Sequence, residues 1–177
     1  MQHLPVFTDF TTIAGKRVIV RVDFNVPEKE DGGVITDDYR LQKTAPFLRR
    51  LLEAGARLVV LSHLTEKKTH RSFKQLLDAL KKHTGLPLEL LYSIDGVKNS
   101  VASCVLLENL RIFPGEEAND PDFAKELASL GDIYINEAFS QSHRANASVV
   151  SVPRFLPTYL GPLFFEEVTK LGEVFDP

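Results

Sequence analysis

The chain has 177 residues, of which 44% are hydrophobic and 25% are charged, and its formal net charge is -3. This length suits one domain with a sizeable core, and the charge balance excludes the broad basic surface of many nucleic-acid-binding proteins. The single cysteine, Cys104, excludes an intrachain disulfide and a cysteine zinc cage. No apolar run approaches the roughly 20 residues that span a bilayer, and the N-terminus lacks a signal-peptide pattern. We therefore expect a cytoplasmic protein.

Short β-rich runs alternate with helical patterns in the first half of the chain. The valine-dense run Arg17–Asp23 predicts a first strand. Leucines at helical spacing predict a helix between Asp37 and Ala54, and Gly55 is typical of a residue that ends a helix. Arg57–Ser62 then predicts a second strand.

The second half of the chain continues this alternation. Helices are predicted after Ser72, after Asp120-Pro121 and over Thr158–Leu171, and strands over Leu88–Leu91, Cys104–Leu107 and Asp132–Asn136. This order indicates an α/β fold: a three-layer, Rossmann-like domain with a mostly parallel β-sheet and helices on both faces.

Polar side chains follow several of the predicted strands, and parallel sheets bind ligands beyond the carboxyl ends of their strands. If the predicted register holds, one sheet edge carries the residues Asp23, Asn25, Arg40, His63, Arg111, His143 and Arg144. Convergent arginines favour an anionic ligand with phosphate and carboxylate groups, because guanidinium groups match both in a bidentate manner. The carboxylate and amide side chains could bind hydroxyl groups of the same ligand.

Several familiar motifs are missing from the sequence. It contains no GxxxxGK[ST] phosphate loop, no GxGxxG after a strand, no GxSxG elbow and no pair of histidines or cysteines at metal-ligand spacing. The residues alone therefore indicate an anion site, and neither a nucleotide site nor a metal site is expected in this chain.

Four segments, in order, resemble the signatures of phosphoglycerate kinases. They are RVDFNVP at Arg21–Pro27, ITDDYRL at Ile35–Leu41, LLENLRI at Leu106–Ile112 and GDIYINEAFSQSHRANAS at Gly131–Ser148. The resemblance implies a glycolytic enzyme that moves a phosphoryl group reversibly between ATP and 3-phosphoglycerate, with Mg²⁺. It also implies that the N-terminal domain binds the glycerate and a C-terminal domain binds ATP or ADP.

Carried over by position, the resemblance assigns residues to the substrate. It implies that the substrate-binding residues are Asp23, Phe24, Asn25, Arg40, His63, Arg111 and Arg144. Asp23 and Asn25 would bind the hydroxyl and carboxylate end. Arg40 would be the catalytic residue that stabilises charge on the transferring group, and Arg111 and Arg144 would hold the far phosphate. A supporting role falls to His143.

The sequence departs from the family pattern beside this site. The family usually reads SHLGRP where this chain has Ser62-His63-Leu64-Thr65-Glu66-Lys67, so Thr65 replaces a glycine and Glu66 an arginine. A carboxylate about 4 Å from a phosphate costs roughly 4 kcal/mol at an effective dielectric near 20, so Glu66 should turn outward or weaken the site. Lys67, Lys68 or Arg71 could supply the missing positive charge from a rearranged loop. In the last motif, the usual aspartate, glycine and second histidine are replaced by Glu137, Ser140 and Asn146.

The resemblance also implies domain boundaries. We expect residues 1–172 to form the substrate-binding domain and residues 173–177 to begin the interdomain hinge, without the nucleotide-binding domain. Such a fragment should bind 3-phosphoglycerate or 1,3-bisphosphoglycerate but not catalyse efficiently. The whole enzyme is expected to be a monomer, whereas the fragment could self-associate. Two alternatives are a degenerate anion-binding module for another phosphorylated ligand and a structural or interaction domain that has lost the site.

Overall fold

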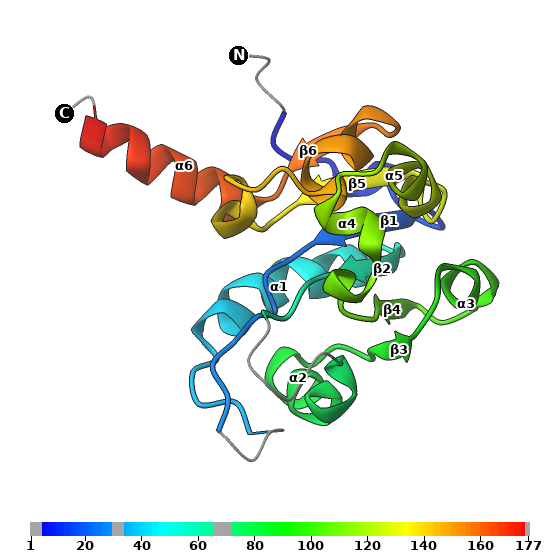
Figure 1. Cartoon of the computed structure of the whole chain (residues 1–177). Helices are drawn as coiled ribbons and strands as arrows, with labels where there is room; N and C mark the ends of the chain where they lie inside the picture. Colours follow the sequence, from blue (N-terminus) through cyan, green and yellow to red (C-terminus); the bar gives the residue numbers. More distant parts are fainter. Residues whose placement is uncertain (1–4, 30–33, 66–71, 176–177) are drawn as a thin grey trace.

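The computed structural model describes residues 5–29, 34–65 and 72–175, and its centre is a six-stranded parallel sheet (Figure 1). The strand order is β3-β4-β2-β1-β5-β6, so β1 lies near the middle of the sheet. The strands are β1 (Arg17–Arg21), β2 (Arg57–Leu61), β3 (Glu89–Leu91), β4 (Cys104–Leu107), β5 (Ile133–Asn136) and β6 (Thr158–Leu160). The predicted parallel α/β fold is confirmed.

Helices cover both faces of the sheet because alternate residues of each strand point to opposite sides. On one face, Val18 and Val20 belong to a core cluster with Leu48 of α1 and Leu80 of α2. On the other face, Ile19 joins residues of α3 and α5. The helices are α1 (Tyr39–Glu53), α2 (Leu77–Thr84), α3 (Ile94–Asn99), α4 (Pro114–Glu117), α5 (Pro121–Ala128) and α6 (Pro162–Phe175), with a short π-helix, η5, at Ala147–Ser151.

The start of α5 and the end of α2 are each set by a single residue in the sequence. The Asp120 carboxylate accepts hydrogen bonds from the backbone N–H groups of Asp122 and Phe123, which caps the start of α5. Gly85 follows α2 with a left-handed φ of 68°, a conformation that glycine adopts without steric cost.

The prediction of one helix over Thr158–Leu171 is wrong at its start. Thr158–Leu160 forms the edge strand β6, which pairs with β5 from Tyr134 to Asn136. The helix begins only at Pro162, a residue that is well tolerated at the first helical position. The short helix α3 was not predicted.

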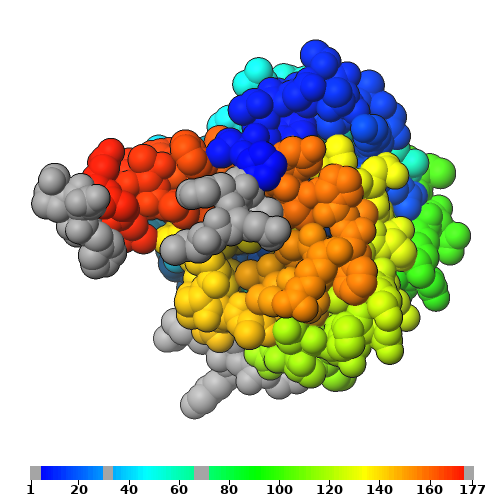
Figure 2. Space-filling view, turned by 90° about the horizontal axis from the view of Figure 1, so that it is seen from above, coloured from blue at the N-terminus to red at the C-terminus, as the bar shows by residue number. Residues whose placement is uncertain are grey.

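The last helix leaves the sheet and projects from the body of the molecule (Figures 1 and 2). The predicted domain end at residue 172 falls inside α6, which continues to Phe175. Phe164 packs edge-on against Phe139, with ring centroids 5.3 Å apart, whereas Phe165, Val168 and Leu171 are exposed. None of the helices in the described ranges has the length and apolarity that crossing a membrane requires.

A buried carboxylate holds the start of α6 against the sheet. Glu137, directly after β5, accepts hydrogen bonds from the backbone N–H groups of Leu163 at 3.2 Å and Phe164 at 3.5 Å. A side chain on Gly161 would occupy the same space, because its Cβ would lie 1.7 Å from Glu137 Oε2. Gly161 therefore allows the carboxylate to reach the helix.

We predict that Gly161→Ala lowers the free energy of unfolding by about 1–3 kcal/mol, because the new methyl group displaces the Glu137 carboxylate. The shorter side chain of Glu137→Asp should recover part of this loss, so the double variant should cost less than the two single changes together. Urea unfolding of the four proteins measures this coupling, and strictly additive costs would contradict it. As a control, Gly172→Ala, whose Cβ meets no atom within 4 Å, should stabilise α6 by about 0.5–1 kcal/mol.

Candidate functional site

The carboxyl ends of four neighbouring strands deliver polar side chains to one edge of the sheet. β1 leads into Asp23, β2 into His63, and β4 into the 3₁₀ turn η3 (Leu110–Ile112) that carries Arg111. β5 leads into a further 3₁₀ turn, η4 (Phe139–Gln141), which carries Ser140. Since β4, β2, β1 and β5 are adjacent and parallel, these residues share an edge although they are far apart in the sequence.

Asp23 lies at the centre of a hydrogen-bonded group at this edge. Its Oδ2 accepts hydrogen bonds from Arg40 Nη1 at 2.7 Å and from Ser140 Oγ at 2.6 Å, and its Oδ1 accepts one from the Asn25 backbone at 3.1 Å. Asn25 in turn accepts through Oδ1 from the backbone N–H and the hydroxyl of Thr65, both at 3.1 Å. The Asp23 side chain is only 9% exposed, whereas that of Arg40 is 48% exposed and can reach a ligand.

His63 is buried among arginines. Burial is the largest cause that lowers the pKa of His63 to about 3, and the charges of Arg21, Arg111, Arg144 and Arg40 contribute to the same shift in that order. The ring is therefore neutral at physiological pH. Its Nδ1 lies 3.2 Å from Arg21 Nη2, and because a guanidinium group only donates, Nδ1 must accept and Nε2 must carry the proton.

Arg21 is fully buried at the end of β1, and Ser148 connects it to a buried carboxylate. Arg21 Nε donates to Ser148 Oγ at 3.1 Å, and Ser148 donates to Glu116 from its hydroxyl at 2.6 Å and its backbone N–H at 2.9 Å. Burial lowers the pKa of Arg21, and the Glu116 charge opposes that shift. The carboxylate therefore compensates a charge that would otherwise be costly inside the protein.

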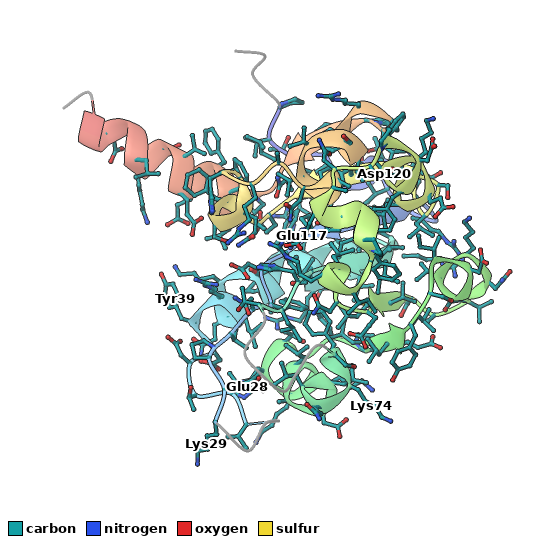
Figure 3. The ribbon with its side chains drawn as sticks, in the orientation of Figure 1. Glu28, Lys29, Tyr39, Lys74, Glu117 and Asp120 are labelled. Atoms are coloured by element: carbon teal, nitrogen blue, oxygen red, sulfur yellow. The ribbon has the colours of Figure 1, made fainter. Side chains whose placement is uncertain are left out.

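Two hollows open at this edge and meet at Thr65. The larger has a volume of about 380 Å³ and is lined by residues that include Asn25, Arg40 and Thr65. The smaller, of about 260 Å³, is lined by Thr65, Arg111, Glu117 and Arg144. Figure 3 labels Tyr39 and Glu28, which line the larger hollow, and Glu117, which lines the smaller one. The larger hollow is thus lined by one guanidinium group and the smaller by two, and each could bind an anionic group.

The other predicted site residues are placed differently. The Phe24 side chain is fully buried in the core, and the Phe24 backbone N–H donates to Ser62 Oγ. The His143 side chain is exposed. Glu66 and Lys67 lie outside the described residues. Within those residues, no group of three or more His, Cys, Asp and Glu side chains is arranged to hold a metal ion.

Comparison with known proteins identifies the family. The family model described as phosphoglycerate kinase matches residues 7–177. The chain belongs to the phosphoglycerate kinase family. It is 42% identical to the phosphoglycerate kinase of Methylorubrum extorquens and 40% identical to that of Dictyoglomus turgidum, in each case over 93% of this chain.

Solved phosphoglycerate kinases share its fold. The structure from Coxiella burnetii has a TM-score of 0.77 at 33% identity over 90% of this chain, and that from Pyrococcus horikoshii has 0.81 at 26% identity over 93%. The chain spans 45% and 43% of the two relatives' lengths and 42% and 44% of the two solved chains. It therefore corresponds to less than half of the phosphoglycerate kinases that it matches.

Three departures from the family signatures have visible consequences in the structure. The Thr65 hydroxyl binds Asn25, and the Ser140 hydroxyl binds Asp23, at two positions where the family usually has glycine. Asn146, where the family has its second histidine, is buried, and its Nδ2 has no hydrogen-bond partner among the described residues. The first two departures thus alter the immediate surroundings of the candidate site.

Sequence reasoning missed the importance of Arg21 and Glu116. A signal for Arg21 was present, because an arginine within the valine-rich strand RVIVRVD must be buried if that strand is central. Its connection to Glu116 joins segments 95 residues apart through Ser148, and no local pattern indicates that pairing.

We predict that Arg21→Met lowers the free energy of unfolding by about 3–5 kcal/mol, because the Glu116 carboxylate stays buried without its cation. Adding Glu116→Gln should restore part of this stability, since neither buried charge then remains. Urea unfolding gives both values. An exposed control, Arg154→Met, should change stability by less than about 0.5 kcal/mol. Full additivity of the first two changes would contradict the prediction.

The burial of Glu137 predicts how the stability of the protein depends on pH. The net pKa of Glu137 is raised from 4.5 to about 8: burial raises it most, the backbone N–H groups of Leu163 and Phe164 oppose that shift, and the nearby Glu167 adds to it. Between pH 4.5 and about pH 8, Glu137 keeps its proton in the folded protein, whereas it has lost that proton in the unfolded chain. The contribution of Glu137 to the free energy of unfolding is therefore lost as the pH rises. Glu137→Gln should remove this loss.

The wild type should therefore lose stability relative to Glu137→Gln between pH 5 and pH 8, with a slope of at most about 1.4 kcal/mol per pH unit. Urea unfolding of both proteins across this range measures the difference and cancels the other titrating groups. Parallel pH profiles would show that Glu137 is already ionised in the folded protein.

Proposed function

We propose that this chain supplies the 3-phosphoglycerate-binding portion of a phosphoglycerate kinase. One observation carries the proposal: Arg40, Arg111 and Arg144, with buried Arg21, surround a single neutral histidine at the edge where the central strands end. Such a cluster favours a ligand with two anionic groups, and the two adjoining hollows offer a place for each. Membership of the family identifies 3-phosphoglycerate as the substrate to test first.

Within this proposal, the two ends of the ligand meet different residues. Asp23 and Asn25 bind its hydroxyl and carboxylate end, and Arg40 stabilises charge on the phosphoryl group that is transferred. Arg111 and Arg144 hold the phosphate that does not react. The Arg111 side chain already pairs with Glu117, an exposed carboxylate that can turn to solvent when a phosphate arrives.

Phosphoryl transfer requires alignment of donor and acceptor and neutralisation of charge rather than covalent help from the protein. We propose that ATP or ADP, with Mg²⁺, is held by residues outside this sequence, so that the chain alone binds substrate without efficient catalysis. We also propose that residues 1–172 act as the substrate-binding domain, with the hinge following. A cytoplasmic, monomeric whole enzyme is consistent with this function. The exposed apolar residues of α6 favour self-association of the isolated chain.

We predict that calorimetric titration of the purified chain with 3-phosphoglycerate gives saturable binding, and that Arg111→Ala weakens it by at least about tenfold because a charge-assisted contact with phosphate is lost. Arg154→Ala is the matched control: this arginine is exposed and lines neither hollow, so its removal should leave affinity within about twofold. Circular dichroism checks that each variant is folded.

Two other results of this titration would argue against the proposed function. No binding by a folded wild-type chain at high millimolar ligand would overturn the proposal and favour a structural domain that has lost the site. Tighter binding of another phosphorylated acid would favour a degenerate anion-binding module.

A further inference from the structure

The Ser140 hydroxyl occupies one acceptor atom at the centre of the candidate site. Its Oγ lies 2.6 Å from Asp23 Oδ2, and Arg40 Nη1 lies 2.7 Å from the same oxygen. Gln141 Nε2, 3.5 Å from Ser140 Oγ, is placed to donate to that hydroxyl, which leaves the hydroxyl proton directed at Asp23. Both lone pairs of this carboxylate oxygen are therefore engaged before any ligand binds.

Few hydrogen-bond positions on the Asp23 carboxylate remain open to a ligand. Its other oxygen, Oδ1, accepts a hydrogen bond from the Asn25 backbone N–H, and its side chain is 9% exposed. An incoming hydroxyl group that donates to Oδ2 competes there with the Ser140 hydroxyl and with Arg40. Where the ligand hydroxyl takes the place of Ser140, the serine loses a hydrogen bond to a charged acceptor, which is stronger than one to a neutral acceptor.

Thr65 repeats this arrangement at Asn25, because its hydroxyl donates to Asn25 Oδ1. The Thr65 backbone N–H donates to the same oxygen, so removal of that hydroxyl leaves one of the two hydrogen bonds in place. Ser140 is different, since its only contribution to Asp23 is the hydroxyl itself. Substitution of Ser140 is therefore the better test of whether a side-chain hydroxyl competes with the ligand hydroxyl.

We infer that Ser140 is a specificity-determining residue, whose hydroxyl competes with a ligand hydroxyl for Asp23 and so disfavours hydroxylated acids relative to acids that lack that group. This inference rests on the proposed function. Removing the Ser140 hydroxyl leaves a hydrogen-bond position open at Asp23 Oδ2. Only ligands with a hydroxyl group that can donate to this oxygen should then bind more tightly.

The test compares two ligands that differ in one group: 3-phosphoglycerate and 3-phosphooxypropanoate, which lacks the 2-hydroxyl. Calorimetry measures both with the wild type, Ser140→Ala and the control Ser142→Ala, whose exposed serine follows the same turn. We expect Ser140→Ala to bind 3-phosphoglycerate about tenfold more tightly, since about 1.4 kcal/mol is tenfold in affinity. Its affinity for the analogue, and both affinities of the control, should stay within about twofold of the wild type.

The outcomes separate this inference from the proposed function. Binding of 3-phosphoglycerate only after Ser140→Ala would also support it. An unchanged ratio of the two affinities, or weaker binding of 3-phosphoglycerate by Ser140→Ala, would overturn the inference and leave the proposed function standing. If neither ligand binds any of the three folded proteins, both fail together.

Discussion

The burial of Arg21 is the constraint on which the candidate site depends. A fully buried guanidinium group at the end of a central strand requires a compensating carboxylate, and Ser148 connects it to Glu116. That connection fixes three separate segments, β1, α4 and η5, around the strand ends. The same guanidinium group contacts His63 Nδ1 and so determines which ring nitrogen carries the proton. The buried Arg21 side chain thus holds these segments together beneath the site and determines which nitrogen of His63 carries the proton.

A buried carboxyl group connects the site to the outgoing helix. Glu137 follows β5 directly, three residues before Ser140, and its carboxylate receives the first backbone N–H groups of α6. The segment that presents Ser140 to Asp23 is therefore bounded by an anchor to α6 on one side and by the Ser148 network on the other.

Much of this organisation is readable from the sequence. Valine-rich runs separated by leucine-spaced helices predict the parallel sheet, and the residues after each strand predict which side chains share its edge. β6 was missed because it has three partly buried residues and no alternation, so the helical pattern of α6 extended back across Gly161. The side chain of Phe24, which follows β1, is buried in the core, and its assignment to the ligand stays a prediction. The Arg21–Ser148–Glu116 connection depends on tertiary packing and has no local signal.

The neutral state of His63 has a consequence for how the site responds to its surroundings. With the ring uncharged, the positive potential at this edge comes from guanidinium groups, which remain protonated throughout the physiological range. The dianion of a phosphate monoester, by contrast, takes up a proton at about pH 6. For a phosphate ligand of the kind proposed above, acidification then weakens the attraction by lowering the negative charge of the ligand, while the neutral His63 ring adds no positive charge.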